Sequence, residues 1–238
     1  MIRAIFRNAG IHPKRLIQAL CGWARYATDR RKFRQLSGPA RWVWGPELPM
    51  FTEWNEFSGS VGAYFHQDLL VAGWIYQNKP ARHVDVGSRI DGFVGHLAVF
   101  REVEVLDIRS QPHAIHNIVF HQIDLMAELP DAWDECTDSL SCLHTIEHFG
   151  LGRYGDTIDP EGHEKGLKQL KRMVKPGGLL YLATPIGQQR IEFNAHRIFS
   201  AETLAGWFKD GWEIERFAWL DDSEVMHEDP AWRDADVK

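Results

Sequence analysis

The chain has 238 residues, of which 44% are hydrophobic and 25% are charged, and its formal net charge is −6. This composition fits one globular α/β domain that is long enough to bury a substantial core. No apolar run approaches the roughly 20 residues of a membrane-spanning helix. The three cysteines have no metal-type spacing, so we expect free thiols in a reducing, cytoplasmic compartment.

The first 41 residues are strongly basic. They hold ten Lys or Arg against one acid, Asp29, whereas the remainder holds 17 basic and 32 acidic residues. A basic segment on an acidic body suits an anionic membrane, a nucleic acid or an acidic partner. One interpretation is peripheral contact with the anionic inner face of a membrane, and nucleic acid is not expected. The alternative is a solvated helix packed on its own domain, which the helical spacing of Leu16, Ile17 and Leu20 favours.

Two helices are predicted before the first strand. The first begins at Pro13, because proline is tolerated in a first turn, and extends to about residue 35. An irregular connection follows over residues 39–60, and the second helix covers residues 61–78. Residues 1–80 are therefore expected to form an N-terminal helical extension. The inner face of the second helix is predicted to carry Tyr64, Leu69, Leu70 and Trp74.

From residue 82 onwards the pattern alternates between strands and helices. Six strands are predicted, over residues 83–87, 102–108, 118–124, 138–143, 179–184 and 212–220. Helices are predicted between them over residues 93–100, 161–174 and 200–209. Such alternation indicates parallel βαβ units, so residues 81–220 should form a mostly parallel sheet with helices on both faces. An acidic, poorly structured tail is expected over residues 221–238.

Polar groups end three consecutive strands. The first strand runs into Gly87-Ser88, where a glycine allows close approach of the backbone to a nucleotide. The second ends at Asp107, about 20 residues on, where a carboxylate accepts hydrogen bonds from ribose hydroxyls. The third ends at Asp124. Together these strand ends predict a nucleotide site at one edge of the sheet.

These features resemble the class I S-adenosylmethionine (SAM)-dependent methyltransferases. Asp85-Val-Gly-Ser88 is similar to their glycine-rich motif, Asp107 to the ribose-binding acid and Asp124 to the residue near the adenine. Val174-Lys-Pro-Gly-Gly-Leu-Leu-Tyr181 resembles a turn and strand of their later half. The resemblance implies a Rossmann-like fold with SAM held by Asp85, Gly87, Ser88, Asp107 and Asp124. Arg89-Ile-Asp91 departs from the pattern, because it replaces the family's usual further glycines.

The fourth strand is followed by His144, Glu147 and His148, three side chains capable of acid–base chemistry or metal binding. The form His-x-x-Glu-His also occurs in zinc peptidases, where it requires a helix. Here it follows an apolar strand in a methyltransferase-like order, so we interpret it as a catalytic cluster at the sheet edge. Without a metal, His144 or His148 would act as a general base.

This cluster also resembles that of metal-dependent O-methyltransferases, which carry Glu-x-x-Glu-His after the fourth strand. The resemblance implies a metal set of His144, Glu147, His148 and His196, with His144 replacing a glutamate. Three histidines and one carboxylate suit zinc, manganese or iron better than magnesium. A metal there would hold substrate hydroxyls and lower the pKa of the one to be methylated.

The chain is also similar to an uncharacterised methyltransferase-like family of bacterial surface-polysaccharide gene clusters, which implies a carbohydrate or nucleotide-sugar substrate. We therefore expect a SAM-dependent O-methyltransferase that acts on a sugar hydroxyl of a surface polysaccharide or its activated precursor. Two rivals stay open. One is a metal-dependent hydrolase or lyase on the same fold without SAM, and the other is a non-catalytic scaffold of a polysaccharide assembly.

Overall fold

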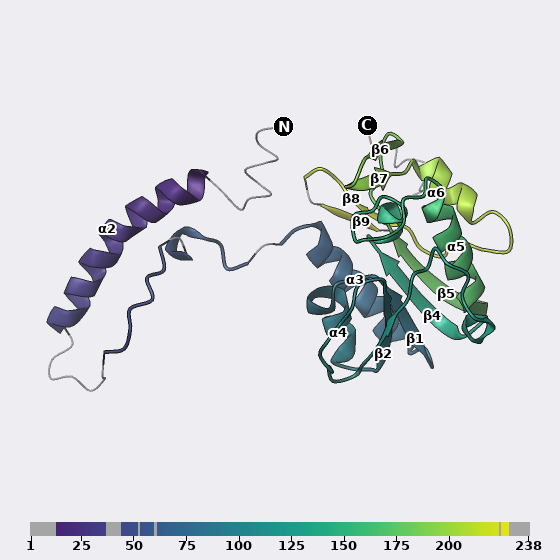
Figure 1. Ribbon diagram of the computed structural model, residues 1–238, viewed down its shortest axis with the longest axis horizontal. Coiled ribbons are helices and arrows are strands. Elements are labelled where there is room, and N and C mark those ends of the chain that lie inside the picture. The colour runs from purple at the N-terminus through teal and green to yellow at the C-terminus, as the bar shows by residue number, and fades with distance from the viewer. Residues whose placement is uncertain (1–12, 37–43, 52, 60, 224, 229–238) are drawn as a thin grey trace. The chain divides into compact units, whose positions relative to one another are not determined.

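The structure is a computed structural model that describes residues 13–36, 44–51, 53–59, 61–223 and 225–228 (Figure 1). The chain divides into two compact units, residues 1–60 and residues 61–238. Within the described ranges, no helix is long and apolar enough to cross a membrane.

The first unit is built on the helix α2 (Pro13–Leu36), as the sequence predicted. The connection after it contains one 3₁₀ turn, η1 (Glu53–Asn55), and returns along one face of the helix. Gly22 permits this approach, since a Cβ there would lie 2.1 Å from the carbonyl oxygen of Phe51. Glu47 accepts hydrogen bonds from the Tyr26 hydroxyl at 2.9 Å and from Arg30 Nε at 2.6 Å.

The second unit holds a parallel five-stranded sheet in the order β3-β2-β1-β4-β5. Five of the six predicted strands form it, and the Rossmann-like prediction is confirmed. The order reverses between β1 and β4, which creates a switch point where the carboxyl ends of strands leave a crevice. The strands are β1 (His83–Val86), β2 (Val103–Asp107), β3 (Ile118–Gln122), β4 (Thr137–Leu143) and β5 (Val174–Ala183).

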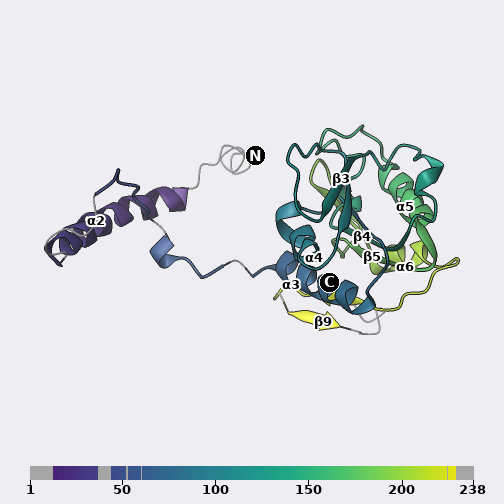
Figure 2. The same cartoon turned by 90° about the horizontal axis from the view of Figure 1, so that it is seen from below.

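Helices cover both faces of this sheet (Figures 1 and 2). On one face, α5 (Gly162–Met173) and α6 (Ala201–Trp207) cover Val84 and Leu140 of the central strands. On the other, α3 (Ala63–Asn78) and α4 (Gly95–Ala98) cover Val105. Because side chains alternate along a strand, His83 and Asp85 of β1 point to the α3–α4 face.

The predicted inner face of α3 is wrong for two residues, because Tyr64 is 62% exposed and Leu69 is 47% exposed. The helix buries Val71, Ala72 and Ile75 instead. Its packing is therefore concentrated in the second half, and its first turns extend past the sheet. This leaves Tyr64 free to contact residues beyond the strand ends.

The predicted sixth strand is also wrong as a member of the sheet. Only β8 (Ala218–Leu220) is extended, and it pairs antiparallel with β9 (Met226–Glu228) in the predicted tail. Trp219 stacks on His227 of β9 at 4.7 Å between ring centroids, while Trp212 packs against the core. The segment therefore uses Trp212 for packing and pairs its last residues with β9 rather than with the central sheet.

Two boundaries differ from the prediction near the site. The helix predicted from residue 93 is preceded by a π-type turn, η2 (Ile90–Val94). The predicted turn after α5 lies within β5, where Gly177 has a φ of +77° and the register with β4 shifts. A short hairpin of β6 (Arg190–Glu192) and β7 (His196–Ile198), not predicted as strands, follows β5.

Candidate functional site

The carboxyl ends of β1, β2, β3 and β4 surround a cleft of about 530 Å³ that is open to solvent. Five of the predicted site residues line the cleft, namely Gly87, Asp107, Asp124, His144 and His148. The chain thus brings most of the predicted nucleotide residues and two members of the predicted catalytic cluster to one cavity.

The turn after β1 depends on Gly87. Its φ is +73°, a conformation that L side chains rarely adopt, and its N–H donates to the Leu106 carbonyl at 2.8 Å. A Cβ at this position would lie 2.2 Å from Cγ2 of Thr145, which follows β4. The turn therefore packs directly on the segment that carries the catalytic cluster.

Asp85 and Ser88 lie beneath this turn and do not line the cleft. The carboxylate of Asp85 accepts hydrogen bonds from the Ser88 N–H at 3.1 Å, the Ser88 hydroxyl at 2.9 Å and the Ser141 hydroxyl at 2.5 Å. Ser141 also lies 3.1 Å from His83 Nε2. The network fixes the turn, so the geometry makes Asp85 and Ser88 supports rather than direct contacts of a ligand.

Burial dominates the electrostatics of this network. It raises the pKa of Asp85 from 3.8 to about 6, against the lowering effect of its hydrogen bonds from Ser141 and Ser88. It also lowers the pKa of His83 from 6.5 to about 3. Both shifts favour the neutral form, as expected for groups held away from water without a charge partner.

Asp107, at the end of β2, is paired with Arg109. Its Oδ1 accepts from the backbone N–H of Arg109 at 2.8 Å and from Arg109 Nε at 2.9 Å, and its Oδ2 accepts from Nη2 at 2.5 Å. The guanidinium also lies 4.7 Å from the ring centroid of Tyr154. A bound ribose would therefore have to displace Arg109 from the Asp107 carboxylate.

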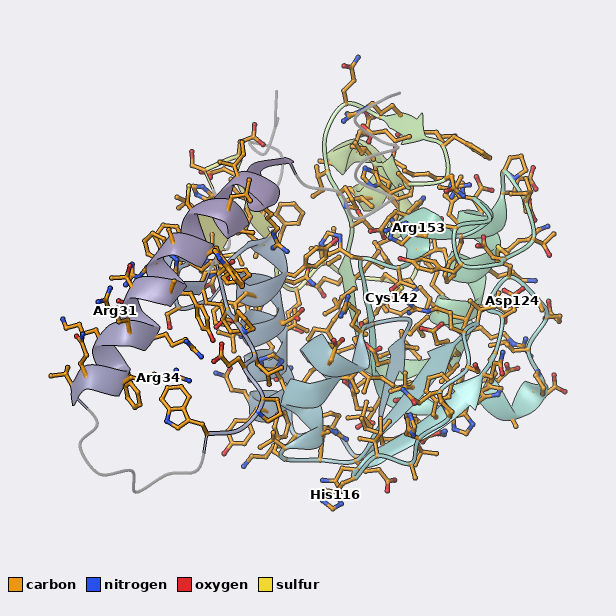
Figure 3. All side chains as sticks on the ribbon, turned by 60° about the vertical axis from the view of Figure 1, so that its left-hand side comes forward. Arg31, Arg34, His116, Asp124, Cys142 and Arg153 are labelled. Carbon is orange, nitrogen blue, oxygen red and sulfur yellow. The ribbon has the colours of Figure 1, made fainter. Side chains whose placement is uncertain are left out.

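The far wall of the cleft combines Asp124 with apolar side chains. Asp124, which is labelled in Figure 3, accepts from the Met126 N–H at 2.8 Å through Oδ1. Ile108, Leu125 and Phe149 supply apolar surface. A carboxylate at β2, a glycine turn at β1 and an apolar slot at β3 fit the ribose and base of an adenosine. These residues are therefore chemically suited to SAM.

His144 follows β4 in a left-handed conformation with a φ of +50°. A non-glycine residue held there is uncommon, and such conformations are enriched at functional sites. Its Nδ1 lies 3.2 Å from Glu147 Oε1. Glu147 in the turn η4 (Ile146–His148) is buried, and its Oε2 has no hydrogen-bond partner in the described chain.

The two nitrogens of His144 consequently differ. When Glu147 accepts from Nδ1–H, the unprotonated nitrogen is Nε2, to which no described residue hydrogen-bonds. The ring of Tyr64 covers His144 edge-on at 4.7 Å between centroids. His144 and Glu147 therefore form a dyad that is able to accept a proton at the edge of the cleft.

The other predicted metal ligands have further partners, although His148 Nε2 lies 3.7 Å from Glu147 Oε1. His148 Nδ1 donates to the Ala195 carbonyl at 2.6 Å, and burial lowers its pKa. His196 lies near it, with ring centroids 6.4 Å apart, but its Nε2 faces Glu192 at 3.3 Å. No three His, Cys, Asp or Glu side chains converge as a metal-binding group within the described ranges. These residues do not fit a bound metal in this arrangement, and the metal set stays a prediction.

Two residues that contact the site, Tyr64 and Arg109, and the nearby Asp68, which does not line the cleft, were not assigned to it from the sequence. Tyr64 and Asp68 belong to a helix that precedes the sheet, and their approach depends on where α3 crosses the strand ends. No local pattern carries that information. The spacing of Asp107 and Arg109 was the one available signal, because residues two apart at a strand end are able to pair.

Comparison with known proteins supports the fold. A family model described as "Caenorhabditis protein of unknown function, DUF268" matches residues 100–227. No curated protein matches the chain. The crystal structure of the [4+2]-cyclase SpnF is similar with a TM-score of 0.50 and 18% identity, over 67% of this chain and 61% of the cyclase.

Two methyltransferases are also similar. 1,6-Didemethyltoxoflavin-N1-methyltransferase of Burkholderia thailandensis, solved with S-adenosylhomocysteine (SAH), has a TM-score of 0.49 and 11% identity over 69% of this chain and 76% of that one. Human N-acetylserotonin methyltransferase, solved with SAM, has a TM-score of 0.46 and 11% identity, over 68% of this chain and 49% of the enzyme.

Proposed function

The chain belongs to the DUF268 family, whose function is unknown, and we propose that it is a SAM-dependent methyltransferase with an oxygen atom as acceptor. One observation carries the proposal. The cleft formed by the Gly87 turn, Asp107 and Asp124 also contains His144, whose partner Glu147 is buried with one free oxygen. A site suited to adenosine thus adjoins a group able to take a proton.

SAM, when bound, would supply a methyl group on a positively charged sulfur. Asp107 would exchange Arg109 for the ribose hydroxyls, and Asp124 would lie near the base. Glu147 holds the His144 Nδ1–H and so directs Nε2 toward a hydroxyl, whose proton Nε2 accepts. The remaining rate enhancement would come from positioning, because methyl transfer between aligned groups needs little further assistance from the protein.

We propose a sugar hydroxyl of a surface polysaccharide, or of its activated precursor, as the acceptor. Tyr154, which is 38% exposed, borders the cleft and offers an aromatic surface for a sugar ring. Arg109 and Arg153 lie 4.7 Å and 5.2 Å from its ring centroid. Guanidinium groups recognise phosphates, so they suit a nucleotide-sugar.

The basic first unit supports a peripheral location at the inner face of a membrane. Arg30 and Arg34 pair with Glu47, whereas Arg31 and Lys32 have no carboxylate partner in the described part of the chain (Figure 3). Binding to phosphatidylcholine vesicles should therefore require added phosphatidylglycerol and should weaken in Arg31→Glu/Lys32→Glu. Equal binding to both vesicles, or to neither, would reject this location.

Transfer of labelled methyl groups from SAM to a panel of nucleotide-sugars tests the proposed activity. Glu147→Gln and His144→Asn should slow transfer by about 100-fold or more, whereas His113→Asn, which changes an exposed histidine outside the cleft, should not. Metal analysis of the same sample tests whether zinc, manganese or iron assists.

The rival enzyme without SAM draws on a specific observation, since both Asp107 and Asp91 are already paired with arginines. Calorimetry separates the two, because the rival predicts no binding of SAH at millimolar concentration. The scaffold rival predicts that alanine at His144, Glu147 and His148 is silent in vivo, whereas neutralising the basic residues of the first unit abolishes function.

A further inference from the structure

Asp68, on the second turn of α3, is a half-buried carboxylate that makes few polar interactions. Its one hydrogen bond is a long one, 3.5 Å, from the amide of the neighbouring Gln67. No described Lys or Arg forms an ion pair with it. A carboxylate in such a position is unfavourable unless something outside the chain completes its interactions.

The position of Asp68 connects it to the glycine turn. Its Oδ2 lies 3.5 Å from the point that a Cβ on Gly92 would occupy, so the carboxylate rests against the turn η2. His96 contacts the same turn, because its Nδ1 donates to the Gly92 carbonyl at 3.0 Å. Burial raises the pKa of Asp68, and interactions with Gln67, His96 and His144 oppose the rise. Asp68 does not line the cleft itself, but it lies against the turn that follows Gly87 and interacts electrostatically with His144.

The two ends of SAM have different requirements. The adenosine end is accounted for by Asp107, Asp124 and the apolar slot on the β2–β3 side of Gly87. With the adenosine end on that side, the amino-acid end would pass Gly87 and His144 of the cleft and continue toward Gly92. Its α-ammonium group needs an acceptor there, preferably an anionic one, because charge-assisted hydrogen bonds are the stronger kind.

We propose that Asp68 binds the α-ammonium group of the cofactor's amino-acid end. Asp68 is the carboxylate at this end of the turn that lacks a cation, whereas Asp91 on the same turn is exposed and paired with Arg89 at 2.6 Å. This inference rests on the proposed function, because it assumes that the cleft takes SAM. It assigns to α3, outside the sheet, a role in cofactor selection.

The test compares two ligands in calorimetry with the full chain, SAH and its analogue without the α-amino group. Asp68→Asn should weaken SAH binding by about 10- to 100-fold, the loss expected for one charge-assisted hydrogen bond. The same variant should bind the deamino analogue as the parent does. Asp91→Asn, which removes the same charge from the turn η2 that Asp68 lies against, should leave both affinities unchanged.

The outcomes are distinct. If Asp68→Asn weakens both ligands equally, or neither, the assignment is wrong while the proposed function stands. If the parent protein binds neither ligand at millimolar concentration, the proposed function fails and the assignment with it. Thermal unfolding checks the fold of the variant, and we expect no loss of stability because a poorly satisfied carboxylate is removed.

Discussion

Replacing Asp85 with asparagine should change the pH dependence of stability in a defined direction. Asp85 is fully buried beneath the glycine turn, and burial raises its pKa from 3.8 to about 6. Between these pH values the folded protein holds a proton that the unfolded chain releases. The protonated carboxyl therefore contributes stability that is fully present below the unfolded pKa and is lost as the pH rises through 6.

The magnitude follows from the size of the shift. A rise from 3.8 to about 6 corresponds to about 3 kcal/mol, at about 1.4 kcal/mol per pKa unit. An asparagine side chain does not titrate, so the free energy of unfolding of Asp85→Asn, relative to the parent, should increase by about 3 kcal/mol between pH 4 and pH 8. His83 titrates in both proteins, and its contribution cancels in the difference.

Urea unfolding of both proteins at intervals between pH 4 and pH 8 measures this difference. Asp91→Asn serves as the control, since Arg89 lowers the pKa of that exposed carboxyl and no increase with pH is expected. A difference that is independent of pH, or that decreases as the pH rises, would refute the reasoning. It would mean that Asp85 is ionised in the folded protein without cost.

Three further changes test the site. Gly87→Ala should abolish SAH binding in calorimetry, because the left-handed turn and Thr145 leave no room for a methyl group. The control Gly155→Ala, at a φ of +85° with open space around it, should bind SAH normally. Glu147→Gln should lower the rate of methyl transfer by about 10²- to 10⁴-fold, the range for general base catalysis, and should leave the SAH affinity unchanged. Equal losses in rate and in SAH affinity would contradict the role of the His144–Glu147 dyad. Arg197→Met should destabilise the protein by about 3 kcal/mol or more in urea unfolding, since the buried guanidinium donates to three carbonyls around the turn η4, and a neutral result would contradict that role.

Much of the fold could be predicted from the sequence. The segments around Val84, Val105 and Leu140 are short and rich in valine and leucine, with polar residues between the apolar ones, and helical segments separate them. Strand ends in a parallel sheet meet at one edge, so Gly87 and Asp107 were predictable neighbours. The same regularity predicted that these residues would line one cleft.

The failures share a physical cause, which is that long-range packing selects among locally equivalent patterns. The segment 212–220 has strand-like residues, yet Trp212 and Trp219 are used in packing. Tyr64 has the spacing of a core residue, yet α3 is buried through its second half and Tyr64 covers His144 instead. The role of Asp85 beneath the turn depends on serines of β4, distant in the sequence.

Calorimetric titration of SAH into the purified full chain tests the central claim most directly, with Asp107→Asn as the paired variant. The account predicts saturable binding of one SAH per chain, and a loss of at least about 10-fold in affinity when the ribose-binding carboxylate is replaced. Absence of binding by the parent at millimolar SAH, or equal affinity in the two proteins, would contradict it.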